Sequence, residues 1–178
     1  MWETFALLQF FEQPLFIVKR ELMWIPFFGW YLRKLNMVEV DRTAGARALL
    51  TMTRRAGEAV RRGRQLVIFP EGTRRPVDAP PDYKSGIAQI YVDCGVPCLP
   101  VALNSGLFWP RRTFMRYPGT LIVEFLDPLP PGLGRREFIG RVSAVIEEAT
   151  RPLVEAARQE QARLFGRVPS SAPAKGKA

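Results

Sequence analysis

The segment 69–75, with the sequence FPEGTRR, combines residue types suited to holding a phosphate group. Gly72 allows a backbone turn that other residues rarely adopt, and Thr73 can donate a hydrogen bond to an oxyanion. Arg74 and Arg75 carry forked donors that match phosphate oxygens, and Glu71 can orient one of these arginines or accept from a substrate hydroxyl. From these residue types alone, a solvated charged turn is the alternative. The segment is not a phosphate-binding P-loop, because no Gly-Lys-Ser/Thr sequence follows it.

The charge of the chain favours an anionic partner. Its 26 Lys and Arg against 17 Asp and Glu give a formal net charge of +9. This charge attracts phosphorylated metabolites, acidic lipid surfaces or nucleic acid. With 0 histidines the chain lacks the commonest general base and metal ligand, and any Ser-His or Cys-His catalytic pair. The 2 cysteines, Cys94 and Cys98, exclude a disulfide framework, and we expect them to be small buried residues with no metal between them.

Hydrophobic periodicity predicts strands that alternate with helices. The expected strands cover residues 15–18, 37–41, 65–69, 96–103 and 121–125. The expected helices cover residues 21–35, broken or bent near Pro26 and Gly29, and then 43–62, 86–93 and 136–164. This order indicates an α/β domain with a layered, largely parallel sheet flanked by helices. Ligands collect at the carboxyl ends of strands in such sheets, which is where segment 69–75 begins.

The chain length of 178 residues favours one domain, with no internal repeat or second boundary. We expect that domain to cover residues 1–164. Residues 165–178 contain almost nothing to bury and are predicted to be a disordered tail. No run of about 18 apolar residues is present that could span a bilayer as a helix.

The beginning of the chain is unusually aromatic. The residues concerned are Trp2, Phe5, Phe10, Phe11, Phe16, Trp24, Phe27, Phe28, Trp30 and Tyr31. Burial in the core is the favoured interpretation, and contact with a membrane surface is the alternative. A second basic and aromatic stretch, residues 108–117, is suited to a membrane interface or to an acidic carrier protein.

Segment 69–75 resembles the signature of the glycerolipid acyltransferases of the 1-acylglycerol-3-phosphate acyltransferase type. Other blocks are similar to the same family in the same order. They are residues 19–22, 26–30, 38–42 (VEVDR), 83–86, 96–101 (VPCLPV) and 104–106. The likeness runs from Glu3 to about Leu164, which covers nearly all of the chain expected to be ordered. The resemblance therefore implies the α/β fold of that family.

The chain departs from the family in one block, in which a histidine is followed by four residues and then Asp or Glu. Glu3, followed by Thr-Phe-Ala, resembles the acidic end of that block. The histidine would then lie three positions before Met1. We expect that the chain is recorded from an internal start, so that the domain lacks its first strand and the catalytic histidine segment. A true histidine-free homologue is the alternative.

The resemblance implies transfer of an acyl group to lysophosphatidic acid, giving phosphatidic acid. The donor would be a thioester of acyl-carrier protein or coenzyme A, with no further cofactor. The implied site residues are Glu3 for catalysis, as the partner of the histidine, and Arg42, Glu71, Gly72, Thr73, Arg74 and Lys84 for substrate binding. For Arg42 and Lys84, a solvated structural side chain is the alternative. Ser105 is not a nucleophile candidate without a base beside it.

Three functional classes follow from these observations. The first is an acyltransferase whose chain is truncated at the amino end, and whose catalytic activity is impaired because the histidine of the motif is absent. The second is an inactive homologue that binds lysophospholipid or membrane. The third, a nucleic-acid-binding protein, is disfavoured because the arginines are dispersed and form no recognition helix. Charge and aromatic content predict a peripheral position on an anionic membrane, at the cytoplasmic face of the inner membrane.

Overall fold

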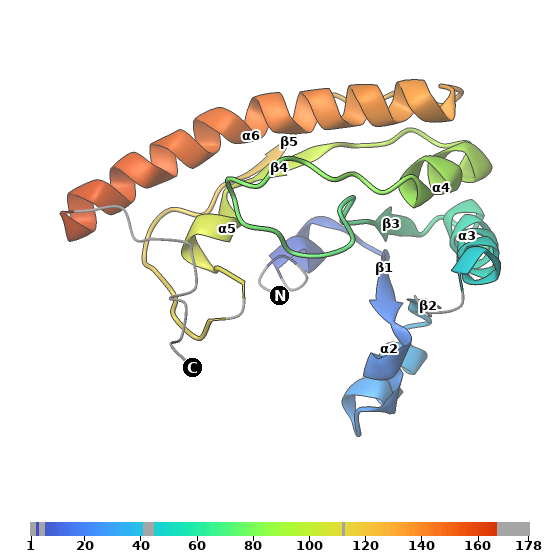
Figure 1. The fold of residues 1–178 in the computed structure, drawn as a ribbon. Coiled ribbons are helices and arrows are strands. Elements are labelled where there is room, and N and C mark those ends of the chain that lie inside the picture. The colour runs from blue at the N-terminus through green and yellow to red at the C-terminus, as the bar shows by residue number, and fades with distance from the viewer. Residues whose placement is uncertain (1–2, 4–5, 41–44, 112, 167–178) are drawn as a thin grey trace.

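The fold is an α/β domain in which helices flank a parallel sheet, as the sequence predicts. The computed structural model describes residues 3, 6–40, 45–111 and 113–166. The long helix α6 (Arg135–Phe165) runs along one side of the molecule, next to α4 (Gly86–Cys94) (Figure 1). Helix α3 (Gly45–Arg61) packs against α4 at one end of the molecule.

The parallel sheet has the order β2-β1-β3, so β1 (Pro14–Lys19) is its central strand. In the register, Lys19 pairs with Val40 of β2 (Val38–Val40), and Phe16 pairs with Val67 of β3 (Gln65–Val67). Leu15 at the centre of this sheet is fully buried, in a cluster that includes residues of α3 and α4. Because the three strands are parallel, the loops that follow them leave from the same edge of the sheet.

A second, antiparallel ladder joins β4 (Val101–Leu103) to β5 (Val123–Phe125). The expected strand 96–103 is longer than the observed one. Pro97 and Pro100 lack the N–H group that a ladder needs, so before β4 only an isolated bridge from Cys98 to Leu129 forms. The expected strand 65–69 also ends early, at Val67, ahead of Pro70.

Helices α3, α4 and α6 follow the predicted ranges closely. Helix α6 ends at Phe165, one position past the expected end of the domain, and residues 167–178 of the expected tail lie outside the described residues. Tyr91 of α4 stacks on Phe138 of α6 with ring centroids 3.9 Å apart, which holds the two helices together. The short helices η1 (Leu7–Phe10) and α5 (Ser105–Phe108) complete the fold. Within the described ranges, no helix combines the length and the apolar character needed to cross a bilayer.

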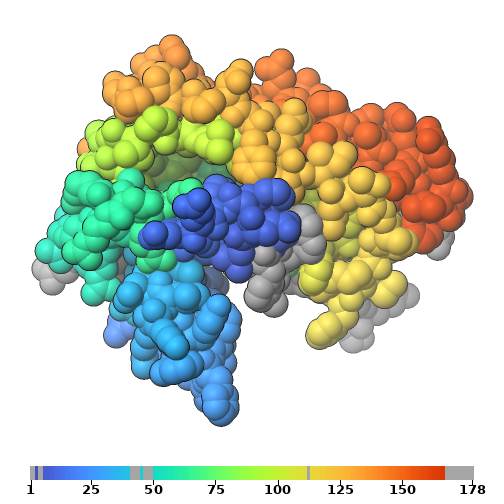
Figure 2. Space-filling model, turned by 180° about the vertical axis from the view of Figure 1, so that it is seen from behind, coloured from blue at the N-terminus to red at the C-terminus, as the bar shows by residue number. Residues whose placement is uncertain are grey.

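The expected helix 21–35 is broken near Pro26, as one of the two predicted alternatives has it, into two short helices, η2 (Arg20–Trp24) and α2 (Phe28–Lys34). We call residues 20–34 the aromatic hairpin. Between its helices, the Phe28 N–H donates to the Pro26 carbonyl oxygen over 2.7 Å, and Phe27 has φ 62°. These are the marks of a classic γ-turn, which is rare and strained. The hairpin projects from the body at the end of β1 (Figure 1), and from behind it is the light-blue projection (Figure 2).

Gly29 of α2 lies directly against the backbone of η2. A Cβ atom there would overlap the carbonyl oxygen of Met23. We expect Gly29→Ala to lower the free energy of unfolding by about 1–3 kcal/mol, because backbone must move to admit the methyl group. In a chain of this size that corresponds to a fall in Tm of roughly 2–10 °C. Thermal unfolding followed by circular dichroism measures it.

The matched control is Gly140→Ala, in the exposed part of α6. No atom lies within 4 Å of the Cβ that this change adds. Alanine favours the helix over glycine, so the Tm of this variant should stay equal or rise. If both variants had the same Tm, the close approach at Gly29 would not matter for stability.

Candidate active site

The predicted phosphate-binding segment leaves the carboxyl end of β3 as a tight turn. The Gly72 N–H donates to the Phe69 carbonyl oxygen over 2.9 Å, and Gly72 has φ +65°, in the left-handed region that favours glycine. The returning limb of the loop closes on this turn, because the Lys84 N–H donates to the Pro70 carbonyl oxygen over 3.0 Å. Gly72 therefore has the turn conformation that the sequence predicts for it.

Arg75 and Lys84 form ion pairs with two carboxylates near the turn, those of Glu71 and Asp82. The Arg75 guanidinium lies 2.8 Å from Asp82 Oδ2 and 3.7 Å from Glu71 Oε1. Glu71 also accepts from the Asp82 N–H over 3.2 Å, and Lys84 Nζ lies 2.5 Å from Asp82 Oδ2. The hydrogen bond from Lys84, with the charge of Arg75, holds the pKa of Asp82 below its usual range. Of the two neighbouring arginines, Glu71 thus orients Arg75.

Arg74 and Thr73 of the same turn are exposed. Among the described residues, the Arg74 side chain forms no ion pair or hydrogen bond. Arg74 can therefore engage an anion without giving up a partner. Lys84 is half-exposed and would have to share its ammonium group with Asp82. The sequence offered no signal for Asp82, whose role depends on how the loop returns.

Arg42 lies outside the described residues, so its role stays a prediction. The chain leaves β2 at Val40, which pairs with Lys19 of the central strand. β3 lies on the other side of that strand. The loops that carry Arg42 and Arg74 thus begin on opposite sides of β1, at the same edge of the sheet.

Glu3 is held by Ser105 at the start of α5. The Ser105 hydroxyl donates to Glu3 Oε1 over 2.6 Å. Burial acts to raise the pKa of Glu3, but the hydrogen bonds that it accepts, that from Ser105 first, bring the pKa below its usual value. Glu3 is therefore kept as a carboxylate, which is the state needed to orient an imidazole and stabilise its positive charge.

Asn104 fixes the position of Ser105. Asn104 is buried, its Nδ2 donates to the Thr120 carbonyl oxygen over 3.0 Å, and its Oδ1 accepts from the Ile122 N–H over 2.8 Å. Sequence reasoning noted residues 104–106 only as a matching block. Their contact with Glu3 spans 102 residues of chain, so no local pattern could reveal it.

The loop after β3 connects the turn to the helix that holds Glu3. Val77 of this loop packs against Leu107 and Phe108 of α5, and its Cγ2 lies 2.9 Å from where a Cβ of Gly106 would be. Next to Val77, Asp78 pairs with an arginine of α6. In Figure 1 the loop crosses the face of the molecule from β3 to α5 and back to α4. The turn and Glu3 therefore belong to one connected part of the structure.

Ser105→Ala should destabilise the protein in a pH-dependent way. At neutral pH, losing a hydrogen bond to the ionised Glu3 should cost about 1–2 kcal/mol of unfolding free energy. A carboxylate with a lowered folded-state pKa stabilises the protein above its unfolded pKa, and this stabilisation is lost as pH falls through the folded-state pKa. The difference from wild type should therefore shrink as pH falls below the ordinary glutamate pKa. Urea unfolding at a series of pH values measures it.

Ser143→Ala is the control for this experiment. The Ser143 hydroxyl donates to the Gly140 carbonyl oxygen within α6, and in the described ranges it forms no hydrogen bond to a carboxylate. Its effect on stability should be small and independent of pH. A pH-independent loss for Ser105→Ala as well would show that the hydroxyl does not hold an ionised Glu3.

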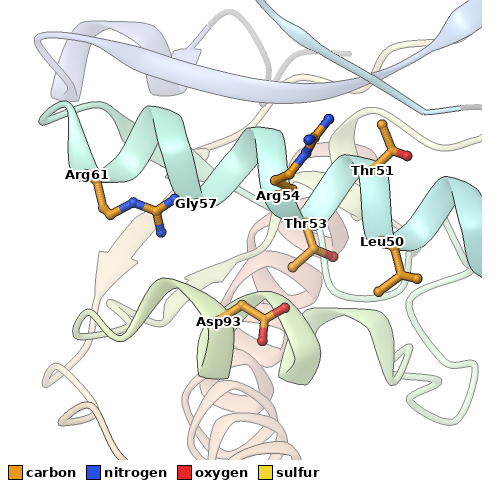
Figure 3. A pocket seen from close by; sticks show the side chains of 7 residues that line it. All are labelled: Leu50, Thr51, Thr53, Arg54, Gly57, Arg61 and Asp93. Atoms are coloured by element: carbon orange, nitrogen blue, oxygen red, sulfur yellow. The ribbon is translucent and has the colours of Figure 1, made fainter.

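Two hollows lie elsewhere on the described surface. The first, of about 460 Å³, is lined by Leu50, Thr51, Thr53, Arg54, Gly57, Arg61 and Asp93. Figure 3 shows Asp93 of α4 across from the α3 residues. The second, of about 420 Å³, lies beside α6 and includes Val77 and Asp78. Neither of these two hollows is lined by Glu3 or by residues 71–74.

No group of three or more His, Cys, Asp or Glu residues in the described ranges is arranged to hold a metal ion. Cys94 and Cys98 are half-buried and pack against separate core clusters. Burial raises the pKa of Cys98 to about 11 and raises that of Cys94 as well. Both therefore act as small apolar residues with thiols that stay protonated at neutral pH.

Known proteins are similar to this chain in sequence and in fold. The family model named Acyltransferase matches residues 2–104. A 1-acyl-sn-glycerol-3-phosphate acyltransferase of Pseudomonas aeruginosa is 41% identical over 122 residues, which are 68% of this chain and 48% of that protein. One from Cocos nucifera is 26% identical over 156 residues, 83% of this chain and 51% of that protein. The chain thus spans about half the length of the curated relatives it matches.

A solved structure extends the comparison to three dimensions. The crystal structure of the 1-acyl-sn-glycerophosphate (LPA) acyltransferase from Thermotoga maritima matches with a TM-score of 0.69 and 31% identity. The match covers 83% of this chain and 59% of that chain. The family match contains Glu3, the turn at 69–75 and Asn104. With its order of motifs, its fold and this match in agreement, the chain belongs to the acyltransferase family.

Proposed function

We propose that the protein transfers an acyl group from a thioester to the free hydroxyl of lysophosphatidic acid, giving phosphatidic acid. The observation that carries the proposal is that Arg74, on the turn after β3, is exposed and has no partner in the described part of a chain whose relatives bear the name of this activity. Arg74 would bind the acceptor phosphate, with Arg42 and Lys84 as further cations. The donor is the thioester of acyl-carrier protein or coenzyme A.

The chemistry needs a base as well as a phosphate site. The acceptor oxygen attacks the thioester carbonyl carbon, its proton passes to the base, and the C–S bond breaks as the thiol takes up a proton. The chain contains 0 histidines, so none of its own residues is an imidazole base. Glu3, ionised and held by Ser105, is placed to orient such a base. Glu71, Gly72 and Thr73 would position the acceptor.

The proposal is tested with a chimera in which this chain follows an added segment that places a histidine three positions before Met1, which we call the histidine block. The chimera is given a radiolabelled acyl thioester and lysophosphatidic acid, and lipids are separated by thin-layer chromatography. Labelled phosphatidic acid that depends on the acceptor supports the proposal. Thioester hydrolysis without phosphatidic acid contradicts it.

A lysophospholipid-binding protein without catalysis is the second candidate, favoured by the lack of histidine in the chain. In that case Arg74 would still bind the phosphate. The chain would bind lysophosphatidic acid in isothermal titration calorimetry, and the chimera would turn over no thioester. If the chimera turned over the acyl thioester, the site would not serve binding alone and this second candidate would be rejected.

We also propose that the protein is peripheral to an anionic membrane, at the cytoplasmic face of the inner membrane. Its acceptor is a lipid, and its net charge of +9 favours an acidic lipid surface. The exposed aromatic side chains described next supply the apolar part of such an attachment. Vesicle flotation tests it, because the electrostatic part of the binding should weaken with salt.

A further inference from the structure

The aromatic hairpin carries an exposed apolar surface. Phe27 is 89% exposed, Trp24 69% and Trp30 65%. Ile25 and Tyr31 beside them are also exposed. Of the other early aromatic residues, Phe10 and Phe28 are exposed, Phe16 of β1 is buried, and Trp2 and Phe5 lie outside the described residues. For the described residues, the favoured interpretation that most of these aromatic side chains lie in the core is therefore wrong. Contiguous apolar patches of this kind mark sites of interaction.

At the tip of the hairpin, Phe27 is exposed to solvent and has a strained backbone conformation. Phe27 is the central residue of the γ-turn, with φ 62°, a conformation that non-glycine residues rarely adopt. Glycine would fit this backbone without strain. A phenylalanine at this position gives the folded protein no burial in exchange, so its side chain is best explained by a partner that covers it.

Basic residues lie on both limbs of the hairpin. In residues 19–35 they are Lys19, Arg20, Arg33 and Lys34, and Glu21 is the acidic residue. Lys34 Nζ lies 5.2 Å from the centroid of the Trp30 ring, and the Arg20 guanidinium lies 6.0 Å from that of Trp24. An apolar tip between cationic limbs, with indole rings at the boundary, matches the layered polarity of an anionic bilayer surface.

The hairpin and the segments expected to bind phosphate leave the parallel sheet at the same, carboxyl end of its strands. The hairpin follows the central strand β1 directly, while the segments that carry Arg42 and Arg74 follow the strands on either side. The three connections leave from the same edge of the sheet. A lipid surface bound by the hairpin would therefore face the edge at which a lipid phosphate is expected to bind.

We propose that the aromatic hairpin docks the protein on membranes: Trp24, Phe27 and Trp30 enter the interfacial layer, and the basic limbs contact the phosphates of anionic lipids. This inference rests on the proposed peripheral association and is independent of the acyl-transfer chemistry. Arg33 also donates to the Met23 carbonyl oxygen over 3.2 Å, which ties the two helices of the hairpin together. The hairpin would thus dock as a preformed unit.

Flotation with vesicles of phosphatidylglycerol or of phosphatidylcholine tests this on the 178-residue chain. Wild type should bind phosphatidylglycerol vesicles more tightly than phosphatidylcholine vesicles. Its binding to phosphatidylglycerol vesicles should weaken as the salt concentration is raised. Phe27→Gly and Trp30→Gln should each weaken the partition coefficient by roughly tenfold, because each removes an aromatic ring from the interface. Phe27→Gly should also keep or raise the Tm, since glycine relieves the strained turn. A loss of binding therefore cannot be attributed to unfolding.

Leu164→Gln is the matched control, because it removes an exposed apolar side chain from the far end of α6. It should bind vesicles as wild type does. If the hairpin variants also bind as wild type does, the hairpin is not the docking element, although the peripheral association stands. If wild type binds no vesicles at low salt, the association and this inference are both wrong.

Two further readouts complete the test. Tryptophan emission should shift to the blue on binding vesicles, and Trp30→Gln should reduce the shift. If sedimentation without lipid instead shows dimers that Phe27→Gly abolishes, while vesicle binding is unchanged, the hairpin joins two copies of the chain and the inference is wrong. Failure of the acyl-transfer assay would leave the vesicle results as they are, so the two proposals fail separately.

Discussion

The chimera that carries a histidine block should transfer acyl groups about 10²–10⁴-fold faster than the 178-residue chain, because general base catalysis contributes that much to such reactions. The corresponding change in barrier is about 3–5 kcal/mol. In the chimera the imidazole would take the proton of the acceptor hydroxyl, and the ionised Glu3 would fix its tautomer. Release of the thiol from the acyl donor, followed with a chromogenic thiol reagent, gives kcat/KM for both proteins.

Two variants of the chimera separate catalysis from added length. Replacing its histidine by glutamine should return the rate to that of the original chain, while keeping the added segment. Glu3→Gln should also lower kcat strongly, with a smaller effect on the KM for either substrate, because the imidazolium loses its partner. Equal turnover by the chain and the chimera would show that no base is missing.

Arg74→Ala in the chimera should raise the KM for lysophosphatidic acid by roughly 10–100-fold, the effect of losing a charge-assisted hydrogen bond to phosphate. The Tm should change little, because Arg74 is exposed and unpaired within the described structure. Arg74→Lys keeps the charge but not the forked geometry, so its effect should be intermediate. Steady-state kinetics with the acceptor and the donor varied in turn measure both terms.

The neighbouring arginine supplies the contrast. Arg75→Ala leaves Glu71 and Asp82 without their shared cation, so it should lower the Tm more than Arg74→Ala does. Arg163→Ala, at an exposed position in the last turn of α6, controls for the loss of one positive charge and should alter neither quantity. If Arg74→Ala raised the KM for the acyl donor alone, the turn would belong to the donor site.

Much of the fold could be predicted from the sequence because short apolar runs favour buried strands and long amphipathic stretches favour helices. The run at 15–18 can bury both faces only at the centre of a parallel sheet, and that is where β1 lies. Strand ends were harder to predict. Apolar residues continue past Val67 and begin before Val101, but prolines limit the ladders there.

The candidate site could be predicted only where its geometry is local. Gly72 and Pro70 determine a turn within a few residues, and the turn is present. The partners of Glu3 and Glu71 depend on how distant segments meet, so the choice of Ser105 and Arg75 required the structure. The exposure of the aromatic hairpin could not be predicted from hydrophobicity. Hydrophobicity reflects the free energy of moving a side chain out of water, and this is similar whether the side chain enters the protein core or a membrane.

The contact between Glu3 and Ser105 also has a consequence for the order of folding. The two residues are 102 positions apart, so closing this contact costs chain entropy that local elements must first offset. During synthesis from the amino end, Glu3 leaves the ribosome long before α5 and the Asn104 network that supports Ser105 exist. The carboxylate can gain its fixed orientation only when Ser105 is present and held by the contacts of Asn104 with Thr120 and Ile122. Partly folded chains would thus contain the acidic residue without its positioning, and catalytic competence would be among the last properties that the nascent protein acquires.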